Sequence, residues 1–324
     1  MAQKTNSKRR DILILLAVVV IALAAYFLTR DRIGSLFSGG LDDPTDDAEN
    51  MYYSIENEIS SAHVLERNGI VLKNAGDRIR AVELSSGIEL DVTDLGDRSQ
   101  APIQDFSEYV SYIYMFDGET VYRSQLDGSE LRATIEDCVQ FEPMGDYLYS
   151  LQPADGALYL FRCSIIGTYE QKLFSEPFLD FFAYDGNLLL QREDGSWWWY
   201  DVVTQDSADM ALPEDAREIA LDTQGALYRM DYGSQEGTLL YEGSVVDFAV
   251  GPHGLGLLLS TGDGGACQAA VCGSSGESPT LLEGQDFSPE SDLDLSASYL
   301  FVTDETGTTY ASPIDAPAWE TLFT

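Results

Sequence analysis

Three consecutive tryptophans, Trp197, Trp198 and Trp199, form the densest group of side chains in this sequence that could hold a ligand. Side chains alternate between the faces of a β-strand, so Trp197 and Trp199 share one face and Trp198 lies on the other. An exposed aromatic face would form a platform for a sugar or a peptide, and a buried one would fill the core. We expect core packing, and we keep Trp197 and Trp199 as candidate ligand-binding residues.

The sequence contains two histidines, His63 and His253, and its carboxylates are too abundant to single out an acid–base pair. His253 lies in the turn-forming segment 251–254, where we expect it to be exposed, and it is our third candidate ligand-binding residue. No G-x-S-x-G elbow, Walker-type loop or dinucleotide-binding glycine motif occurs, and the Cys and His residues lack zinc-ligand spacing. The sequence therefore predicts no catalytic residue, no metal site and no cofactor.

Acidic residues dominate the charged side chains, with 55 Asp and Glu against 18 Lys and Arg and a net charge of −37. Nucleic-acid binding requires clustered basic residues, so this charge argues against nucleic acid as a partner and against an anionic lipid surface. Acidic runs at 42–47 and 292–294 lack the spacing of a calcium-binding loop. We expect a solvated, self-repelling surface, with recruitment of a basic partner or cations as the alternative.

A repeat of about 40 residues organises most of the chain. Seven times an apolar run reaches a glycine-containing turn and a second apolar run follows, at spacings of 42, 38, 39, 42, 28 and 42 residues. The turn glycines are Gly76, Gly118, Gly156, Gly195, Gly237, Gly265 and Gly307. Strand–turn–strand units at this period are typical of a β-propeller. We predict an all-β, seven-bladed propeller, with six blades as the alternative.

Flanking runs complete each unit as a four-stranded blade. An inner strand A precedes each hairpin, as in VQFEP (139–143) and LDFFAY (179–184), and an outer strand D follows it, as in LRATI (131–135) and WETLF (319–323). The short interval of 28 residues predicts that the fifth blade has lost or shortened strand D. Such an open edge is a possible docking site for a partner strand. The last blade is built from C-terminal sequence alone, so we expect packing to close the ring unless residues 51–61 add a strand.

The N-terminus predicts a membrane anchor. Residues 12–28 form an apolar run that would span about 25 Å as a helix, close to the roughly 30 Å of a hydrocarbon core. Basic residues precede this run and favour a cytoplasmic N-terminus. We predict a cytoplasmic stub at 1–11, a transmembrane signal-anchor helix from Ile12 to Leu28, a linker at 29–50 and the propeller at 51–324. A cleaved signal peptide is the alternative, since Ala22-Leu23-Ala24 resembles a cleavage site.

Four cysteines, Cys138, Cys163, Cys267 and Cys272, could pair in an exported domain. Four cysteines allow three connectivities, and sequence does not choose among them. Cys267 and Cys272 have an odd separation, which places them on opposite faces of a regular strand. We expect buried free thiols.

One blade resembles a known family. In residues 112–135 a strand ends in Arg123, Leu126, Asp127, Gly128 and Ser129, similar to the Arg-x-x-Leu-Asp-Gly-Ser run of the low-density-lipoprotein-receptor type of propeller. The Tyr-Trp-Thr-Asp signature of that family is absent. The whole layout resembles membrane-anchored bacterial propellers of unknown function grouped with it. This resemblance implies six or seven blades and exposure outside the membrane, and it implies no activity.

These features together predict an extracytoplasmic, membrane-anchored propeller that binds or scaffolds an envelope protein or a glycan. An exported hydrolase or lyase with carboxylates at the propeller axis is the alternative, and a structural or sensory ectodomain is a third possibility. Clustered carboxylates with perturbed pKa values at the axis would favour the enzyme.

Overall fold

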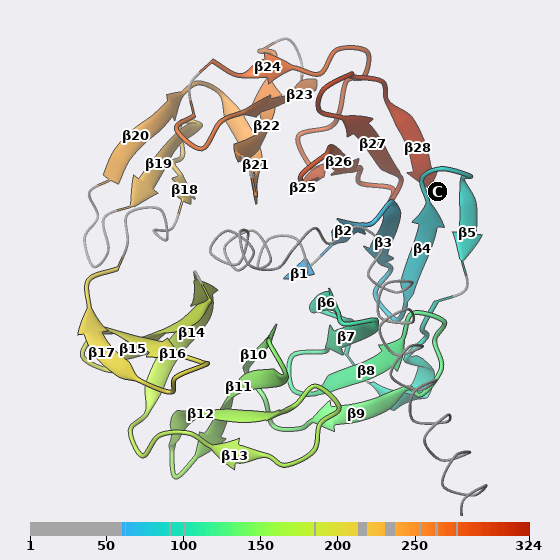
Figure 1. The fold of residues 1–324 in the computed structure, drawn as a ribbon. Coiled ribbons are helices and arrows are strands. Elements are labelled where there is room, and N and C mark those ends of the chain that lie inside the picture. Colours follow the sequence, from blue (N-terminus) through green and yellow to red (C-terminus); the bar gives the residue numbers. More distant parts are fainter. Residues whose placement is uncertain are drawn as a thin grey trace, which may run out of the picture. The chain divides into compact units, whose positions relative to one another are not determined.

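The computed structural model places seven antiparallel β-sheets around a central axis (Figure 1). The structure describes most of the chain after Ile59. The described residues are 60–61, 63–90, 92–99, 101–184, 186–212, 219–230, 237–252, 254–262, 265–276 and 278–324. The seven sheets are the blades of a β-propeller, numbered here one to seven in chain order, and their strands are called A to D from the axis outward. The prediction of seven blades rather than six is confirmed.

The first three blades follow the predicted order of strands. Blade one contains β2 (Val64–Arg67), β3 (Ile70–Asn74), β4 (Ile79–Glu83) and β5 (Ile88–Leu90). Blade two contains β6 (Asp105–Tyr109), β7 (Tyr112–Phe116), β8 (Val121–Gln125) and β9 (Arg132–Ile135), after the short 3-10 helix η1 (Gly96–Arg98). Blade three contains β10 (Gln140–Met144), β11 (Tyr147–Ala154), β12 (Ala157–Ser164) and β13 (Gln171–Lys172).

The last four blades continue the ring. Blade four contains β14 (Phe178–Tyr184), β15 (Asn187–Arg192), β16 (Trp197–Asp201) and β17 (Ser207–Met210). Blade five contains β18 (Ile219–Leu221), β19 (Ala226–Met230) and β20 (Gly237–Glu242). Blade six contains β21 (Val245–Gly251), β22 (Gly254–Ser260), β23 (Cys267–Cys272) and β24 (Thr280–Leu281). Blade seven contains β25 (Asp292–Leu295), β26 (Tyr299–Thr303), β27 (Thr309–Pro313) and β28 (Glu320–Phe323).

The turns between strands B and C explain why the sequence repeat is visible. Gly76, Gly118 and Gly307 lie in these turns with φ of +91°, +97° and +83°. Side chains other than glycine rarely adopt this left-handed region, and tight hairpins require it. Each of these three glycines therefore marks a point where the chain reverses. Gly237, predicted as the turn glycine of blade five, is instead the first residue of β20 and has no positive φ.

Blade five is the irregular blade that the short interval predicted. Its sheet has three strands in the order β18-β19-β20, whereas the other blades have at least four. Strand β20 runs almost directly into β21 of blade six, since only Gly243 and Ser244 separate them. The prediction of a missing strand D is confirmed.

The ring closes by side-chain packing between blades seven and one. Val64, Val71 and Val82 of blade one form one hydrophobic cluster with Phe301 and Phe323 of blade seven. The extra strand β1 (Ser60–Ser61) does not join blade seven. It pairs with β6 and extends the inner edge of blade two to five strands. Closure therefore depends on packing, as the C-terminal origin of blade seven predicted.

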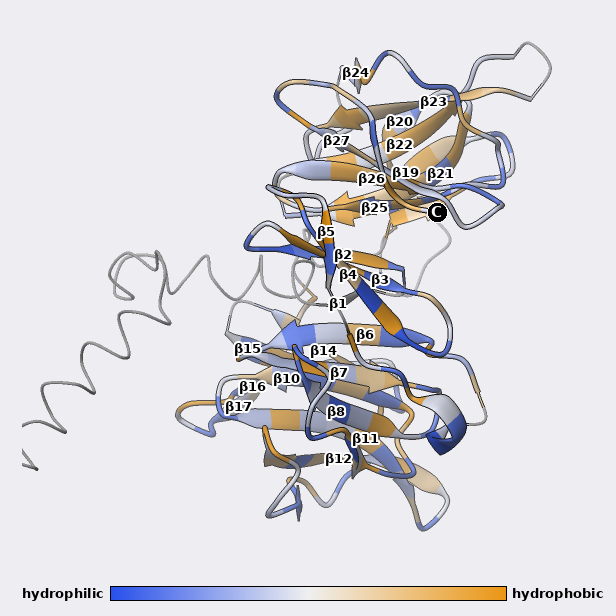
Figure 2. Cartoon of the chain, turned by 90° about the vertical axis from the view of Figure 1, so that its right-hand side faces the viewer, coloured by the Kyte–Doolittle hydropathy of each residue, from blue (hydrophilic) through white to orange (hydrophobic). Residues whose placement is uncertain are grey.

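Hydrophobic residues concentrate along the strands, and hydrophilic residues concentrate on the connecting loops (Figure 2). Because each blade is covered on both faces by its neighbours, the central strands read as nearly continuous apolar runs. In β15 the central residues Leu188, Leu189 and Leu190 are all fully buried, which a half-exposed sheet would not allow.

The four cysteines are free, as expected: Cys138, Cys163 and Cys267 are buried and Cys272 is half-buried. Burial raises the pKa of the Cys138 and Cys163 thiols to about 12, so both stay protonated at neutral pH. The predicted anchor at Ile12–Leu28 lies outside the described residues. Within the part of the chain that the structure describes, no helix is long and apolar enough to cross a membrane.

Replacing Phe323 should weaken the closure of the ring. Its side chain is 1% exposed, packs between blades seven and one, and lies beneath the guanidinium of Arg80 at 5.2 Å from the ring centroid. We expect Phe323→Ala to lower the free energy of unfolding by about 3–5 kcal/mol, measured by chemical denaturation. The matched control is Leu281→Ala on the outer strand of blade six, whose side chain is 44% exposed. An equal effect of the two substitutions would show that closure does not limit stability.

Candidate functional site

Strand A, the innermost strand of each blade, carries a polar residue at an equivalent position in successive blades. In the six blades where it is described, this residue stands opposite a residue near the end of strand B, as Asp105 does with Phe116 and Asp247 with Leu258. We call this set the inner belt. Its described members are His63, Asp105, Gln140, Asp180, Asp247 and Asp292. The equivalent position in blade five, residue 218, lies outside the described residues.

Local hydrogen bonds fix the belt carboxylates. The backbone N–H of Phe106 donates to Asp105 Oδ1 at 2.7 Å, and that of Phe181 donates to Asp180 Oδ1 at 2.8 Å. In blades four and six the pairing of strand A shifts register just before the belt residue, between Phe178 and Asp180 and between Val245 and Asp247. Each register shift is a β-bulge, and the two bulges place Asp180 and Asp247 at the same pairing position as Asp105.

Two members of the belt also join neighbouring blades. Asp247 Oδ2 of blade six accepts the backbone N–H of Leu293 in blade seven at 3.1 Å. Gln140 of blade three donates through Nε2 to the carbonyl of Phe181 in blade four. The belt therefore ties inner strands together where no β-ladder connects one blade to the next.

Desolvation perturbs two of the belt carboxylates. Burial raises the pKa of Asp105 to about 6, partly offset by its hydrogen bond from Phe106 and by nearby His63. Burial also raises the pKa of Asp247, and the neighbouring charge of Asp292 acts in the same direction. A carboxyl group that titrates near pH 6 can hold or release a proton under physiological conditions, as a general acid must.

No group of three or more His, Cys, Asp or Glu side chains is arranged to hold a metal ion in the described ranges. The belt can thus supply hydrogen bonds, negative charge and a titrating carboxyl group. The signal for it was present in the sequence as a repeated Asp-Phe at the start of strand A, in residues 105–106, 180–181 and 247–248. None of these aspartates was among the predicted site residues.

The tryptophans of β16 lie away from the belt, in strand C of blade four. Trp197 is 6% exposed and packs edge-to-face on Phe182, with ring centroids 5.3 Å apart. Trp198 stacks on Phe178 and beneath the guanidinium of Arg192. Trp199 is half-buried. Of the two candidate residues Trp197 and Trp199, it is therefore the one whose side chain is more accessible. The aromatic platform stays a prediction, and His253 lies outside the described residues.

The outer edge of blade five is formed by β20. It pairs with β19, and no further described strand pairs with it. Its first three residues are exposed, including Leu239 at 46%. The loop of blade six approaches its second half, where Gly276 lies against the carbonyl of Leu240. The open part of this edge is therefore Gly237–Leu239.

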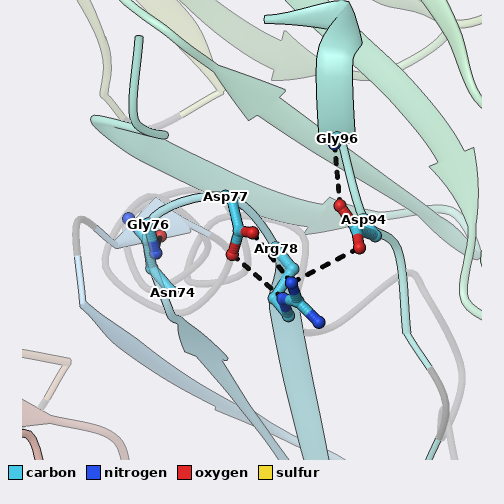
Figure 3. Close-up of polar contacts among 6 residues, drawn as sticks. All are labelled: Asn74, Gly76, Asp77, Arg78, Asp94 and Gly96. Atoms are coloured by element: carbon cyan, nitrogen blue, oxygen red, sulfur yellow. Dashed lines mark hydrogen bonds and ion pairs between the residues drawn. The ribbon is translucent and has the colours of Figure 1, made fainter. Parts of the chain in front are cut away.

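A polar cluster beside the first B–C turn is held by one arginine (Figure 3). Arg78 donates to both carboxylate oxygens of Asp77 at 2.8 and 2.9 Å and lies 3.5 Å from Asp94. Asp94 in turn accepts the backbone N–H of Gly96 at 2.7 Å. The hydrogen bond from Arg78 lowers the pKa of Asp77. The single positive charge of Arg78 is shared by the two carboxylates, and these contacts fix the loop.

Comparison with known proteins supports the fold and leaves the family open. No protein-family model matches the sequence, and no curated protein matches it. A prolyl endopeptidase structure superposes with a TM-score of 0.50 at 12% identity, covering 94% of this chain and 55% of that protein. The membership of the receptor-type propeller family stays a prediction.

Two further structures are less similar. The nidogen/laminin complex gives a TM-score of 0.36 at 12% identity, covering 79% of this chain and 93% of that one. The tricorn protease gives a TM-score of 0.32 at 11% identity, covering 83% of this chain. This chain spans about a third of the length of the tricorn protease and about half that of the prolyl endopeptidase. At these identities the likeness to the prolyl endopeptidase shows the fold alone.

Asp105 should make stability depend on pH. Its pKa is higher in the folded chain than its ordinary value of 3.8, so the folded state binds more protons between about pH 4 and pH 6. Stability should therefore fall as pH rises through this range, by on the order of 3 kcal/mol. Asp105→Asn keeps the acceptor for Phe106 and should flatten this dependence. Denaturation at several pH values checks the effect, with exposed Asp97→Asn as control; an unchanged slope in Asp105→Asn would contradict it.

Proposed function

We propose that this chain is a membrane-anchored, extracytoplasmic binding module whose propeller holds an envelope protein at the outer edge of blade five. The propeller fold is compatible with a binding or scaffold role. The observation that carries the proposal is β20, a six-residue strand at an outer edge that lacks strand D.

The edge of blade five differs from the other outer edges. A strand C, β20, forms this edge, whereas a strand D of two to four residues forms it in the other six blades. Short edge strands are a common protection against unwanted pairing, and a long exposed edge is a template for an added strand. The open part of β20, Gly237–Leu239, offers an incoming strand backbone hydrogen bonds and one apolar contact with the exposed side chain of Leu239.

The proposed occupant is an extended segment of a protein with basic character. The chain carries a net charge of −37, which steers positively charged partners toward it and repels acidic ones. A glycan held on the accessible surface of Trp199 is the alternative ligand. The apolar run Ile12–Leu28 with its preceding basic residues supports attachment to the cell membrane with the propeller outside.

Photocrosslinking from the blade-five edge tests this function. A photoreactive amino acid at position 239, in the full chain on intact cells, should capture a defined protein, and the same group at position 281 should not. Leu281 is the matched control because it lies on the outer strand of blade six and is 44% exposed, close to the 46% of Leu239. A second substitution, Thr238→Pro, should abolish the capture because proline disrupts an edge ladder. Identical products from positions 239 and 281 would contradict the proposal.

A second function is favoured by the raised pKa of Asp105. A carboxyl group with a pKa of about 6 suits a general acid, so the inner belt could serve an exported hydrolase or lyase. We expect any hydrolysis of chromogenic glycosides or esters by the full chain to fall at least about 100-fold in Asp105→Asn, since general acid catalysis contributes about that much. Activity that survives the substitution would exclude Asp105 as the acid, and exposed Asp97→Asn serves as control.

A further inference from the structure

The two ends of the propeller ring differ in their exposed apolar side chains. Neighbouring strands of a blade are antiparallel, so in the six blades with strands A to D the A–B and C–D turns lie at one end, here called the A–B end. The B–C turns and the connections to the next blade lie at the opposite end. Eight exposed large apolar side chains lie in or directly beside the turns of the A–B end. They are Ile88, Val110, Leu126, Tyr147, Ile166, Tyr169, Val203 and Val250.

The opposite end of the ring is more acidic. Among the described residues it has two exposed large apolar side chains, Val139 and Leu179. Its turns and connections include DGET at 117–120, EDC at 136–138, EDG at 193–195 and DE at 304–305. At the A–B end, the turns at 68–69, 84–87 and 110–111 contain no Asp or Glu. The ring therefore has a more apolar end and a more acidic end.

Two apolar side chains at the A–B end occupy backbone positions that favour other residues. The A–B turn of blade one has Asn68 and Gly69 at φ of +53° and +77°, the usual residues for a hairpin with two left-handed positions. Blade two has Val110 and Ser111 at +50° and +66°, a conformation that β-branched residues rarely adopt. Tyr169, in the C–D turn of blade three, has a φ of +60° and is 90% exposed. Such strain at an exposed apolar side chain is typical of binding surfaces.

The exposed apolar side chains of the A–B end are spread around the ring, over blades one, two, three, four and six. The turns of blades two and three touch, since Tyr109 donates its hydroxyl to the carbonyl of Gly145 at 3.1 Å and Arg132 donates to that of Ile166 at 3.0 Å. A partner that contacts the turns of several blades at once must present a broad and even surface. The interfacial region of a lipid bilayer is such a surface, and tyrosine is enriched where proteins meet it.

The N-terminal chain enters the propeller from the A–B end. Strand β1 is antiparallel to β6, with Ser60 opposite Ser107. Strand β6 runs toward the A–B turn at Val110, so the chain before Ser60 comes from that end. The predicted anchor Ile12–Leu28 lies in this N-terminal part. A tether attached at the A–B end holds it near the bilayer, and weak apolar contacts then act at a high effective concentration.

We propose that the A–B end of the propeller docks on the lipid bilayer to which the chain is anchored, with the side chains of Val110, Tyr169 and Val203 in the interfacial region. This docking rests on the membrane attachment that is part of the proposed function. The acidic end then faces away from the bilayer. The reverse orientation would bring its carboxylates against the phosphate groups of the lipids, which repel them.

Photocrosslinking in neutral vesicles tests the docking. The full chain is reconstituted in phosphatidylcholine, whose headgroup carries no net charge, with a photoreactive amino acid at position 110 or 179. Val110 and Leu179 are both 51% exposed and lie at opposite ends of the ring. We expect at least about tenfold more phospholipid adduct from position 110, since only groups in the interface meet lipid often. Equal lipid adducts from the two positions, or crosslinks from position 110 to a second copy of the chain, would overturn the proposal.

Two substitutions weaken the contact and keep the fold. Asparagine tolerates the left-handed region, so Val110→Asn and Tyr169→Asn relax their turns while removing apolar surface. With the photoreactive group at position 203, the double variant should give at least about threefold less lipid adduct, because less apolar area leaves water on docking. The matched control Leu179→Asn should leave the adduct unchanged. An undiminished adduct in the folded double variant would contradict the docking by these side chains.

Flotation of the vesicles separates the docking from the membrane attachment on which it rests. A chain that does not float with the vesicles after an alkaline wash would contradict the anchor at Ile12–Leu28 and the docking together. A chain that floats and gives no lipid adduct from position 110 would overturn the docking alone. On intact cells, a protein adduct in place of the lipid adduct from position 110 would also overturn it, whatever position 239 captures.

Discussion

Face-to-face packing of neighbouring blades is the interaction on which this structure depends. A single four-stranded sheet leaves two apolar faces exposed, and each face here is covered by the sheet before or after it in the chain. Hydrogen-bonded ladders run within blades, so the ring is held by side chains such as those of Phe301 and Phe323 at its closure. Among the described strands none is exchanged between blade seven and blade one, and these two blades are not consecutive in the chain, so their contact depends on side-chain packing. The inner belt adds hydrogen bonds between inner strands at Asp247 and Gln140.

This dependence on packing explains how blade five can lose a strand. Strand D lies at the rim, farthest from the contacts that hold the ring, so its absence exposes an edge without opening the interfaces near the axis (Figure 1). The blade-six loop that reaches Leu240 covers part of the vacant position. A ring stabilised near its axis thus leaves its rim and its loop-bearing faces free to vary, which is where binding functions are usually found in rigid scaffolds.

The hairpins could be predicted from the sequence because residues within each turn determine them. Turn glycines with positive φ, such as Gly76 and Gly307, mark hairpins that no neighbouring blade has to specify. The inner belt was not predicted, because it depends on register: a bulge before Asp180 and another before Asp247 place these carboxylates level with Asp105. The raised pKa of Asp105 could not be predicted from the sequence either, since burial of its side chain in the folded chain causes it. The burial of Trp197 against Phe182 follows from the same tertiary packing.

A repeat protein offers its own internal reference, and the differences between its blades can be interpreted against that reference. Where blades two and three both place an arginine over a tyrosine, that pair is the ordinary filling of the space between neighbouring sheets. Blade six keeps the length, the belt Asp and the strand pairings of blade two, and it lacks the tyrosines. In blade six the side chains of Leu295 and Leu300 lie 2.6 Å from where Cβ atoms at Gly251 and Gly256 would stand, and the backbone carbonyl of Cys272 lies 2.0 Å from that of Gly254. Neighbouring atoms thus fill the places from which the tyrosine side chains of blade two extend, and glycine at these three positions permits that closer approach.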